Sequence, residues 1–263
     1  MIFMQIRTVT GDYIRDLLAS GAREDGRDML DYRRITIKKG AVPNAEGSAD
    51  VNFGNTRVLV GVKLGVGEPM PDKPNEGNLI TSAELLPLAS ESFEAGPPSP
   101  EAIELGRVID RGIRSSGMID TKALFIEEGK VWDLFIDVYI LNYDGNLFDA
   151  GTLAASKALS TARMPKLEGE EVIREGNLGK LKVNNIVTSC TFAKIAENIV
   201  LDPDGNEEAF MDARVTMAND EKVIRAMQKG LSGSFAPKEL ENLLDITFDK
   251  SKELRKHIES AKE

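Results

Sequence analysis

The sequence predicts an α+β fold in which mixed β-sheets pack with helices. Segments of strand periodicity alternate with segments of helical periodicity along the 263 residues. Several strand segments follow one another across short turns, which indicates antiparallel hairpins. Hairpins within such an alternation favour mixed sheets over a doubly wound parallel sheet. With 41% hydrophobic residues, the chain is long enough to bury a large core.

The first hundred residues predict a helix followed by strands. Residues 8–20 have helical periodicity, with Thr10 as a candidate N-cap. Residues 33–40, RRITIKKG, alternate as a strand does. Residues 49–66 predict a hairpin with its turn at Gly54–Asn55, because two alternating runs flank that dipeptide. The proline-rich residues 68–77 predict a loop, and residues 79–90 return to an extended pattern.

The remaining elements continue the alternation. A helix is expected from about Pro100, since proline suits a first helical turn. A long strand is expected from Lys130 up to the Asp-Gly-Asn turn at residues 144–146. The small residues 152–162 predict a second helix that follows the Asp-Gly-Asn turn. Residues 181–195 and 198–220 predict further strands, and residues 237–260 a charged helix.

Composition excludes several classes of function. The net charge of −10 argues against non-specific coating of nucleic acid or of an anionic membrane, although a local basic site stays compatible with it. No apolar run is long enough to span a bilayer. The N-terminal residues carry arginine and aspartate where a signal peptide needs an apolar stretch. We therefore expect a cytoplasmic protein without a membrane partner.

Three arginines stand out in this acidic chain. Arg107, Arg111 and Arg114 fall within a wedge of about 60° on the predicted helix, opposite its apolar residues. One interpretation is a solvated face with Glu104–Arg107 and Asp110–Arg114 ion pairs. The other is a contact with a phosphate backbone, because the guanidinium fork suits phosphate oxygens. The pattern alone leaves both open.

A second charged cluster is acidic and consists of Asp202, Asp204, Glu207, Glu208 and Asp212. Carboxylates in this number suit a magnesium site or an acid catalyst, but Pro-Asp-Gly-Asn is also a turn sequence between two strands. The glycine spacing does not fit an EF-hand loop. A single histidine and a single cysteine argue against a zinc site and against a catalytic triad.

Five segments together resemble the RNase PH family, and within it the non-catalytic ring subunits of archaeal exosomes. They are AREDGRD, GSADVNFGNTRVLVGVK, ELLPLASESFEAGPPSPEAIELGRVIDRGIR, VWDLFIDVYILNYDGNLFDAGTLAASKAL and DPDGNEEAFMDARVTMA. The resemblance implies an RNase PH-type fold with two similar βαβα-like halves. Residues 1–263 would form a single domain of two lobes, with the boundary at roughly 170–180, an N-terminal helix and a C-terminal helical segment.

The resemblance also implies partners. Three copies would alternate with three catalytic RNase PH-like subunits in a hexameric ring, a trimer of heterodimers. Single-stranded RNA would thread through the channel and be shortened from its 3′ end by phosphorolysis, and RNA-binding cap subunits would cover one face. Arg107 and Arg111, with Arg114 as a weaker third, would reach across the subunit interface toward RNA in the partner's site. No cofactor is implied.

The departures from the family pattern argue against catalysis by this chain. Catalytic relatives carry Gly-Thr/Ser-Arg at a helix start, where the arginine holds phosphate, whereas this chain has Gly151, Thr152 and Leu153. They also carry a Glu-Asp pair with a second aspartate six residues after its Asp, whereas Asp212 follows Glu208 by four. We expect no catalytic residues and no metal site. The alternatives are an active phosphorolytic exoribonuclease subunit and an RNA-binding module without an enzyme partner.

Overall fold

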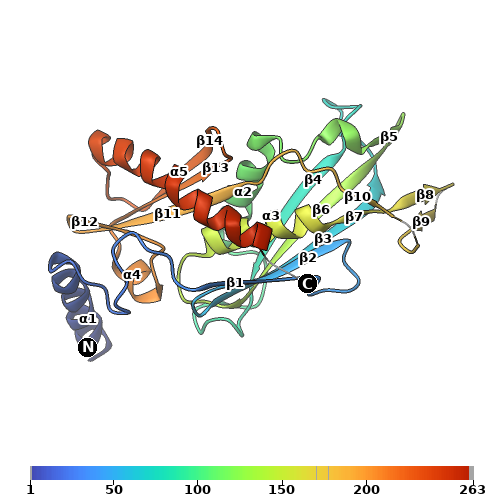
Figure 1. The fold of residues 1–263 in the computed structure, drawn as a ribbon. Helices are drawn as coiled ribbons and strands as arrows, with labels where there is room; N and C mark the ends of the chain where they lie inside the picture. Colours follow the sequence, from blue (N-terminus) through green and yellow to red (C-terminus); the bar gives the residue numbers. More distant parts are fainter. Residues whose placement is uncertain (1, 170, 177, 261–263) are drawn as a thin grey trace.

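The larger of the two main sheets forms the first lobe of the molecule (Figure 1). The computed structural model describes residues 2–169, 171–176 and 178–260. The sheet has the strand order β1-β2-β3-β6-β4, with β5 paired to β6 beside this path. Its strands are β1 (Ile35–Lys39), β2 (Gly47–Phe53), β3 (Thr56–Gly67), β4 (Asn78–Leu85), β5 (Phe125–Glu127) and β6 (Lys130–Asn142). Only β4 runs parallel to its neighbour β6, so the sheet is mixed.

Two helices cover one face of this sheet. They are α2 (Pro100–Ser116), which packs on β4, and α3 (Leu147–Thr161), which packs on β2 and β3. Every second residue of β3 and β6 is buried beneath them, as the alternation of a strand requires. The alternate residues of β3 and β6 point to the opposite face of the sheet, and most of them are partly exposed.

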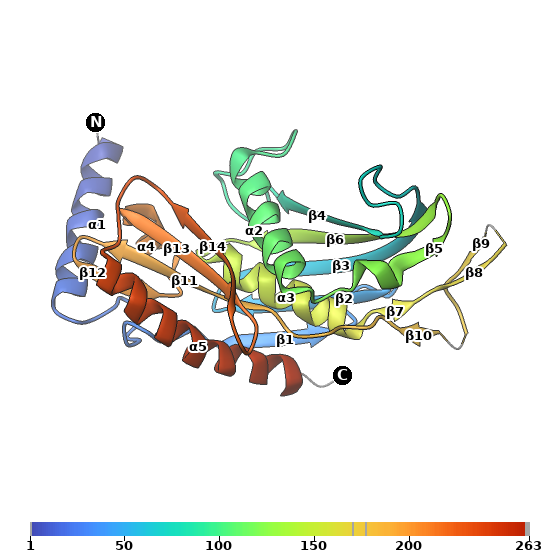
Figure 2. The same cartoon turned by 90° about the horizontal axis from the view of Figure 1, so that it is seen from above.

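The second sheet has the order β12-β11-β13-β14 and is wholly antiparallel. Its strands are β11 (Thr188–Ile195), β12 (Asn198–Leu201), β13 (Ala213–Asn219) and β14 (Ile224–Gly230). The long helix α5 (Pro237–Ser260) packs on β11 and β13. Helix α1 (Ile2–Ala19) and the short α4 (Gly205–Phe210) lie together at the far end of this sheet (Figure 2).

A single cluster of buried apolar side chains runs through both sheets. It includes Val51 and Ile136 of the first sheet and Phe192, Met217 and Leu254 of the second lobe. Helix α3 contacts strands of both sheets, so it lies between the lobes. The small paired strands β7 (Arg163–Met164) and β10 (Gly179–Lys180), and β8 (Lys166–Glu168) and β9 (Glu171–Ile173), form the connection between them.

The expected elements are present, with three corrections. Helix α1 begins at Ile2, so Thr10 lies inside it and is not its N-cap. Helix α3 begins at Leu147, capped by the Asn146 side chain, so Gly151 and Thr152 lie within the helix. Residues 205–210 form α4 and not a turn, because Asp204 and Glu207 make a reciprocal capping box.

Candidate nucleic-acid interface

Helix α2 presents the three arginines because its two faces differ sharply. Ser99 caps its N-terminus by accepting a hydrogen bond from the Ala102 amide, and Gly117, with φ of 64°, ends it. Leu105, Ile109 and Ile113 are buried beneath it, as the periodicity predicted. Arg107, Arg111 and Arg114 are exposed on the opposite side.

The three arginines differ in their surroundings. Arg114 Nε and Nη2 donate to the two Asp110 carboxylate oxygens, both over 3.0 Å, and Nη2 also donates to the Leu79 carbonyl over 2.9 Å. Arg111 Nη1 donates to Gln228 Oε1 over 3.2 Å. Within the described part of the chain, Arg107 has no ion pair. The three residues form an arginine stripe along α2, and its cationic charge that no described carboxylate neutralises resides on Arg107 and Arg111.

Of the two ion pairs that a solvated face would use, one forms and one does not. Asp110 pairs with Arg114, as that interpretation expected. Glu104 instead pairs with Arg214 of β13 over 2.7 Å and accepts a longer hydrogen bond from Gln228. Arg214 also lies 4.1 Å from the centre of the Phe148 ring. Glu104 is therefore paired with the second lobe, and it does not neutralise the charge of Arg107.

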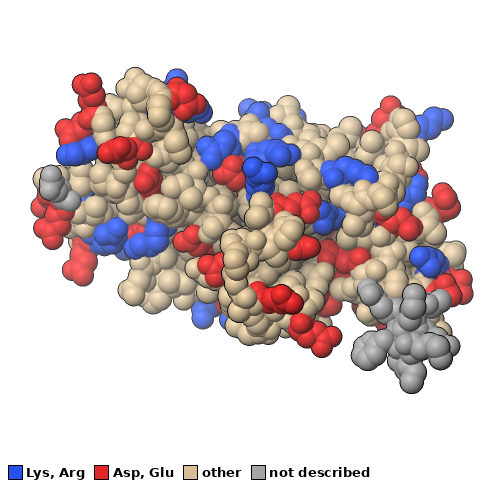
Figure 3. Space-filling model, turned by 180° about the vertical axis from the view of Figure 1, so that it is seen from behind, with Lys and Arg blue, Asp and Glu red and all other residues tan. Residues whose placement is uncertain are grey.

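The location of α2 makes these arginines accessible. The helix lies on the side of the molecule opposite α5 (Figure 2). Seen from behind, the molecule carries a group of basic side chains near the upper centre of this face, bordered by acidic ones (Figure 3). A local basic site on an acidic protein is the arrangement that steers a phosphate chain to one place.

The acidic cluster is committed to internal contacts. Asp202 lies within 3.0 Å of Arg33 and Arg27, and Asp204 caps α4. Glu207 forms a buried two-pronged ion pair with Arg23, over 2.8 and 2.6 Å. These contacts use the carboxylate oxygens that a metal ion would need.

The remaining two acids are engaged as well. Glu208 accepts hydrogen bonds from the Tyr143 hydroxyl over 2.7 Å and from the Asn146 amide over 2.8 Å. Burial raises the pKa of Glu208 above its ordinary value, against these two hydrogen bonds. Asp212 accepts from the Ala196 amide over 2.7 Å. Among the described residues, no group of three or more His, Cys, Asp or Glu side chains is arranged to hold a metal ion.

Leu153 lies deep in the core. It is 0% exposed and belongs to the apolar cluster shared by both lobes. It sits in the second turn of α3, so the expectation that residues 151–153 form a helix start is wrong. The N-terminal turn of α3 carries Asp149, which is also fully buried. Neither side chain is placed to attract a phosphate.

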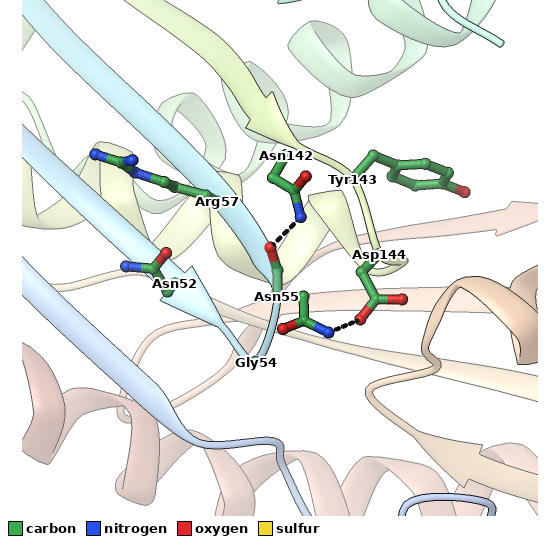
Figure 4. A pocket seen from close by; sticks show the side chains of 7 residues that line it. All are labelled: Asn52, Gly54, Asn55, Arg57, Asn142, Tyr143 and Asp144. Carbon is green, nitrogen blue, oxygen red and sulfur yellow. Dashed lines mark hydrogen bonds between the residues drawn. The ribbon is translucent and has the colours of Figure 1, made fainter. Parts of the chain in front are cut away.

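Sequence reasoning missed a polar hollow at the Gly54–Asn55 turn. It has a volume of about 520 Å³ and is lined by Asn52, Gly54, Asn55, Arg57, Asn142, Tyr143 and Asp144 (Figure 4). Asn142 donates to the Asn55 carbonyl over 2.6 Å, and Asn55 donates to Asp144 over 3.2 Å. A register shift between β3 and β6 at Arg57 and Val58 shapes it. Two runs of asparagine and glycine were its only signal in the sequence.

In the described residues, no helix combines the length and the apolar composition that a membrane span requires. The buried Cys190 packs inside the second lobe and accepts a hydrogen bond from the Tyr32 hydroxyl over 3.1 Å. Neither feature offers an exposed charged site. The arginine stripe of α2 is the candidate site that exposure and charge support best.

Comparison with known proteins agrees with the resemblance. The chain is 49% identical over 251 residues to the exosome complex component Rrp42 of Thermococcus gammatolerans, across 93% of this chain and 92% of that protein. It is 44% identical over 261 residues to the Rrp42 of Methanothermobacter thermautotrophicus, across 97% of this chain and 96% of that protein.

Solved structures give the same result and confirm the predicted fold class. A chain of the Archaeoglobus fulgidus exosome with RNA bound to the active site superposes with a TM-score of 0.90 at 39% identity, over 95% of this chain and 98% of that one. A chain of an archaeal exosome core gives 0.88 at 35% identity, over 99% and 100%. Family models match residues 31–165 as domain 1 and residues 185–250 as domain 2. The chain therefore belongs to the 3′ exoribonuclease family, the RNase PH family.

Proposed function

We propose that this chain is a non-catalytic ring subunit of an archaeal exosome in the cytoplasm. It structures the active site of a catalytic RNase PH-like partner and helps to bind single-stranded RNA during 3′-to-5′ phosphorolytic degradation. Three copies alternate with three partners in a hexameric ring, and RNA-binding cap subunits complete the complex. The curated relatives named as exosome components and the similar exosome structures support this assignment.

The observation that carries the non-catalytic role is Leu153. Phosphorolysis brings two anions together, inorganic phosphate and RNA, so it depends on cations held against the phosphate. At the position where the resemblance expects a phosphate-binding arginine, this chain has an apolar side chain that is 0% exposed. The acids of the second lobe are engaged with Arg23, Tyr143 and backbone amides, which supports the same role.

The arginine stripe supports the RNA-binding role. Arg107 and Arg111 are exposed and retain their positive charge, whereas Arg114 is paired with Asp110. We propose that Arg107 and Arg111 contact RNA phosphates at the junction with the catalytic subunit. Phosphate contacts carry no base information, so the contribution is independent of sequence.

One experiment separates this proposal from the two alternatives. The purified chain is incubated with single-stranded RNA, phosphate and magnesium, alone and after co-expression with the catalytic subunit of the same genome. The proposal expects no nucleoside diphosphate from the chain alone and phosphate-dependent release by the complex. Release by the chain alone indicates an active subunit. Failure to assemble with the catalytic subunit, with RNA binding retained, indicates an independent binding module.

A further inference from the structure

Strand β14 forms one edge of the second sheet and contacts α2. In the pairing register Ala226 lies opposite Ala218, whose Cβ packs against Gly112 of α2. Gln228 follows Ala226 by two residues and therefore points to the same face of the sheet. Ala226 and Gly230, its neighbours on that face, are too short to reach a polar group of the helix. The Gln228 side chain bridges the strand and the helix.

The side-chain amide of Gln228 contacts two charged residues of α2. Its Oε1 accepts a hydrogen bond from Arg111 Nη1 over 3.2 Å, and its Nε2 donates to Glu104 Oε1 over 3.4 Å. A guanidinium only donates and an ionised carboxylate only accepts, so these neighbours permit one orientation of the amide. The reverse orientation would place the amide NH2 against the guanidinium and the amide oxygen against the carboxylate.

Glu104 is itself held from the second lobe. Arg214 Nη2 donates to Glu104 Oε1 over 2.7 Å. The Arg214 guanidinium lies 4.1 Å from the centre of the Phe148 ring, and its side chain is only 11% exposed. Glu104 is therefore fixed by a mostly buried cation, and it in turn fixes the orientation of the Gln228 amide.

The neutral partner of Arg111 distinguishes it from the other two arginines of the stripe. Asp110 neutralises Arg114, whereas the Gln228 amide contacts Arg111 without removing its charge. For the Arg107 side chain, no hydrogen bond or ion pair is found among the described residues. Arg111 therefore combines a full positive charge with a fixed contact.

A fixed contact matters because a long side chain loses rotamer freedom when it binds a ligand. A side chain that is already held before the ligand arrives loses less freedom on binding. Ordering of one flexible side chain changes affinity by about two- to tenfold. A neutral acceptor beside Arg111 lowers this cost and leaves the charge available to a phosphate.

We infer that Gln228 is a positioning residue for RNA binding, which holds the Arg111 guanidinium ready for an RNA phosphate without neutralising it. This inference rests on the proposed function, because Gln228 acts on RNA only through Arg111. It adds a residue of the second lobe to the RNA-binding site on α2.

The first test replaces Gln228 with methionine, which has a similar length but neither hydrogen-bonding group of the amide. The variant is assembled with the catalytic subunit, and its affinity for single-stranded RNA of mixed sequence is measured over a range of salt concentrations. We expect affinity to fall by about two- to tenfold. The slope of log affinity against log salt should stay unchanged, because Arg111 keeps its charge.

A double-mutant cycle with Arg111→Ala separates positioning from a structural role. If Gln228 acts through Arg111, Gln228→Met should have no further effect on RNA affinity in the Arg111→Ala ring. Asn198→Leu is the matched control, because Asn198 is a partly exposed amide in β12, the opposite edge strand of the same sheet. It should leave RNA affinity unchanged.

The second variant, Gln228→Glu, keeps an acceptor for Arg111 and adds a negative charge. The new carboxylate should neutralise Arg111 as Asp110 neutralises Arg114, and the salt slope should flatten by up to about 0.7. Asn198→Asp makes the same chemical change at the opposite edge of the sheet and should leave the slope unchanged. An unchanged slope for Gln228→Glu would overturn the inference, even if Gln228→Met did not fold.

The remaining outcomes distinguish the inference from the proposed function. If Arg111→Ala weakens RNA binding but Gln228→Met binds RNA as the parent does, the inference is overturned and the proposed function stands. An equal loss from Gln228→Met with and without Arg111 would also overturn it, since the effect would then come from the sheet. If Arg111→Ala changes neither affinity nor slope, the proposed RNA contact of Arg111 fails and the inference fails with it.

Discussion

Arg114 and Asp110, one turn apart on α2, form a two-pronged ion pair in which Nε and Nη2 each lie 3.0 Å from a carboxylate oxygen. The arrangement holds the guanidinium plane against its own helix and neutralises its charge. Arg107 and Arg111, which lie in the same stripe, have no carboxylate partner among the described residues. The three arginines look equivalent in the sequence, but they differ in the structure: a carboxylate neutralises Arg114, whereas no described one neutralises Arg107 or Arg111.

Replacing Arg107 and Arg111 together with alanine should weaken RNA binding by the assembled ring and leave assembly intact, because the buried face of α2 is untouched. Each phosphate contact on single-stranded RNA contributes about 0.7 to the slope of log affinity against log salt. Loss of two contacts should flatten that slope by about 1.4. The loss should be similar for unrelated RNA sequences. An unchanged slope would mean that the stripe is a solvated face.

Asp110→Asn should have the opposite effect. The substitution removes the negative charge that neutralises Arg114 but keeps an oxygen for the hydrogen bond from the Thr81 hydroxyl. The freed cation should steepen the salt slope by up to about 0.7. Arg114→Ala in the parent should change RNA affinity little, and it serves as the control. A strong effect of Arg114→Ala would show that the ion pair opens to bind RNA.

Leu153→Arg should not create a phosphorolytic site. The side chain is 0% exposed, so arginine there would bury an unpaired charge inside the core that joins the lobes. We expect a loss of about 3–5 kcal/mol in the free energy of unfolding, measured by denaturant titration. Leu153→Met, which conserves volume, should cost less than about 1.5 kcal/mol. Phosphate-dependent RNA decay by a folded Leu153→Arg variant would contradict the account.

Asp149 should make stability depend on pH. Burial raises its pKa to about 7, from 3.8 for the unperturbed group, against hydrogen bonds from Asn146, Thr191 and Ser189. The folded state therefore binds the proton more tightly than the unfolded state, so this contribution is fully present at low pH and is lost as pH rises to about 7. Between pH 5 and 7 the loss should be about 1 kcal/mol per pH unit.

The control for Asp149 is Asp149→Asn, which does not titrate. It should be less stable than the parent, since its amide group meets hydrogen-bond donors, but its melting temperature should vary less between pH 5 and 7. Equal pH slopes for the two proteins would show that the four hydrogen bonds to Asp149 keep it ionised throughout.

The two lobes should unfold together, because one apolar cluster joins both sheets. Trp132 is buried in the first lobe and Cys190 in the second, so each lobe has its own probe. Tryptophan fluorescence and thiol reactivity should give coincident denaturation curves. Separate midpoints would indicate two domains, with a boundary near the expected 170–180 connection.

Local patterns in the sequence predicted much of this fold. The Gly54–Asn55 hairpin and the two faces of α2 follow from periodicity and turn residues, and both are present. The α4 helix was missed although its signal was visible, since Asp204 and Glu207 have the spacing of a capping box. The start of α3 was missed because Asn146 caps it with a φ of 49°, a conformation that resembles the turn expected there.

The ion pairs of the candidate site could not be read from spacing alone. Glu104 and Arg107 have helical spacing, but Glu104 pairs with Arg214, which is 110 residues away in the sequence. Similarly, Glu207 belongs to an acidic run but is paired with Arg23, 184 residues distant. Tertiary neighbours compete with local ones for each charged side chain, and only the folded chain shows which of them prevails.

One glycine sets how closely α2 packs against the second lobe. A Cβ added at Gly112 would lie 3.2 Å from the Ala218 Cβ of β13, which is tighter than an ordinary contact, so one of the two would have to move by a few tenths of an ångström. At Gly106, where α2 packs on β4, an added Cβ would make only an ordinary contact of 3.5 Å with the Ala83 amide nitrogen. Helix α2 therefore packs on both lobes, on β4 and on β13. Gly112→Ala would move this part of α2 away from the second lobe by a few tenths of an ångström, and it would carry the arginines proposed to contact RNA with it.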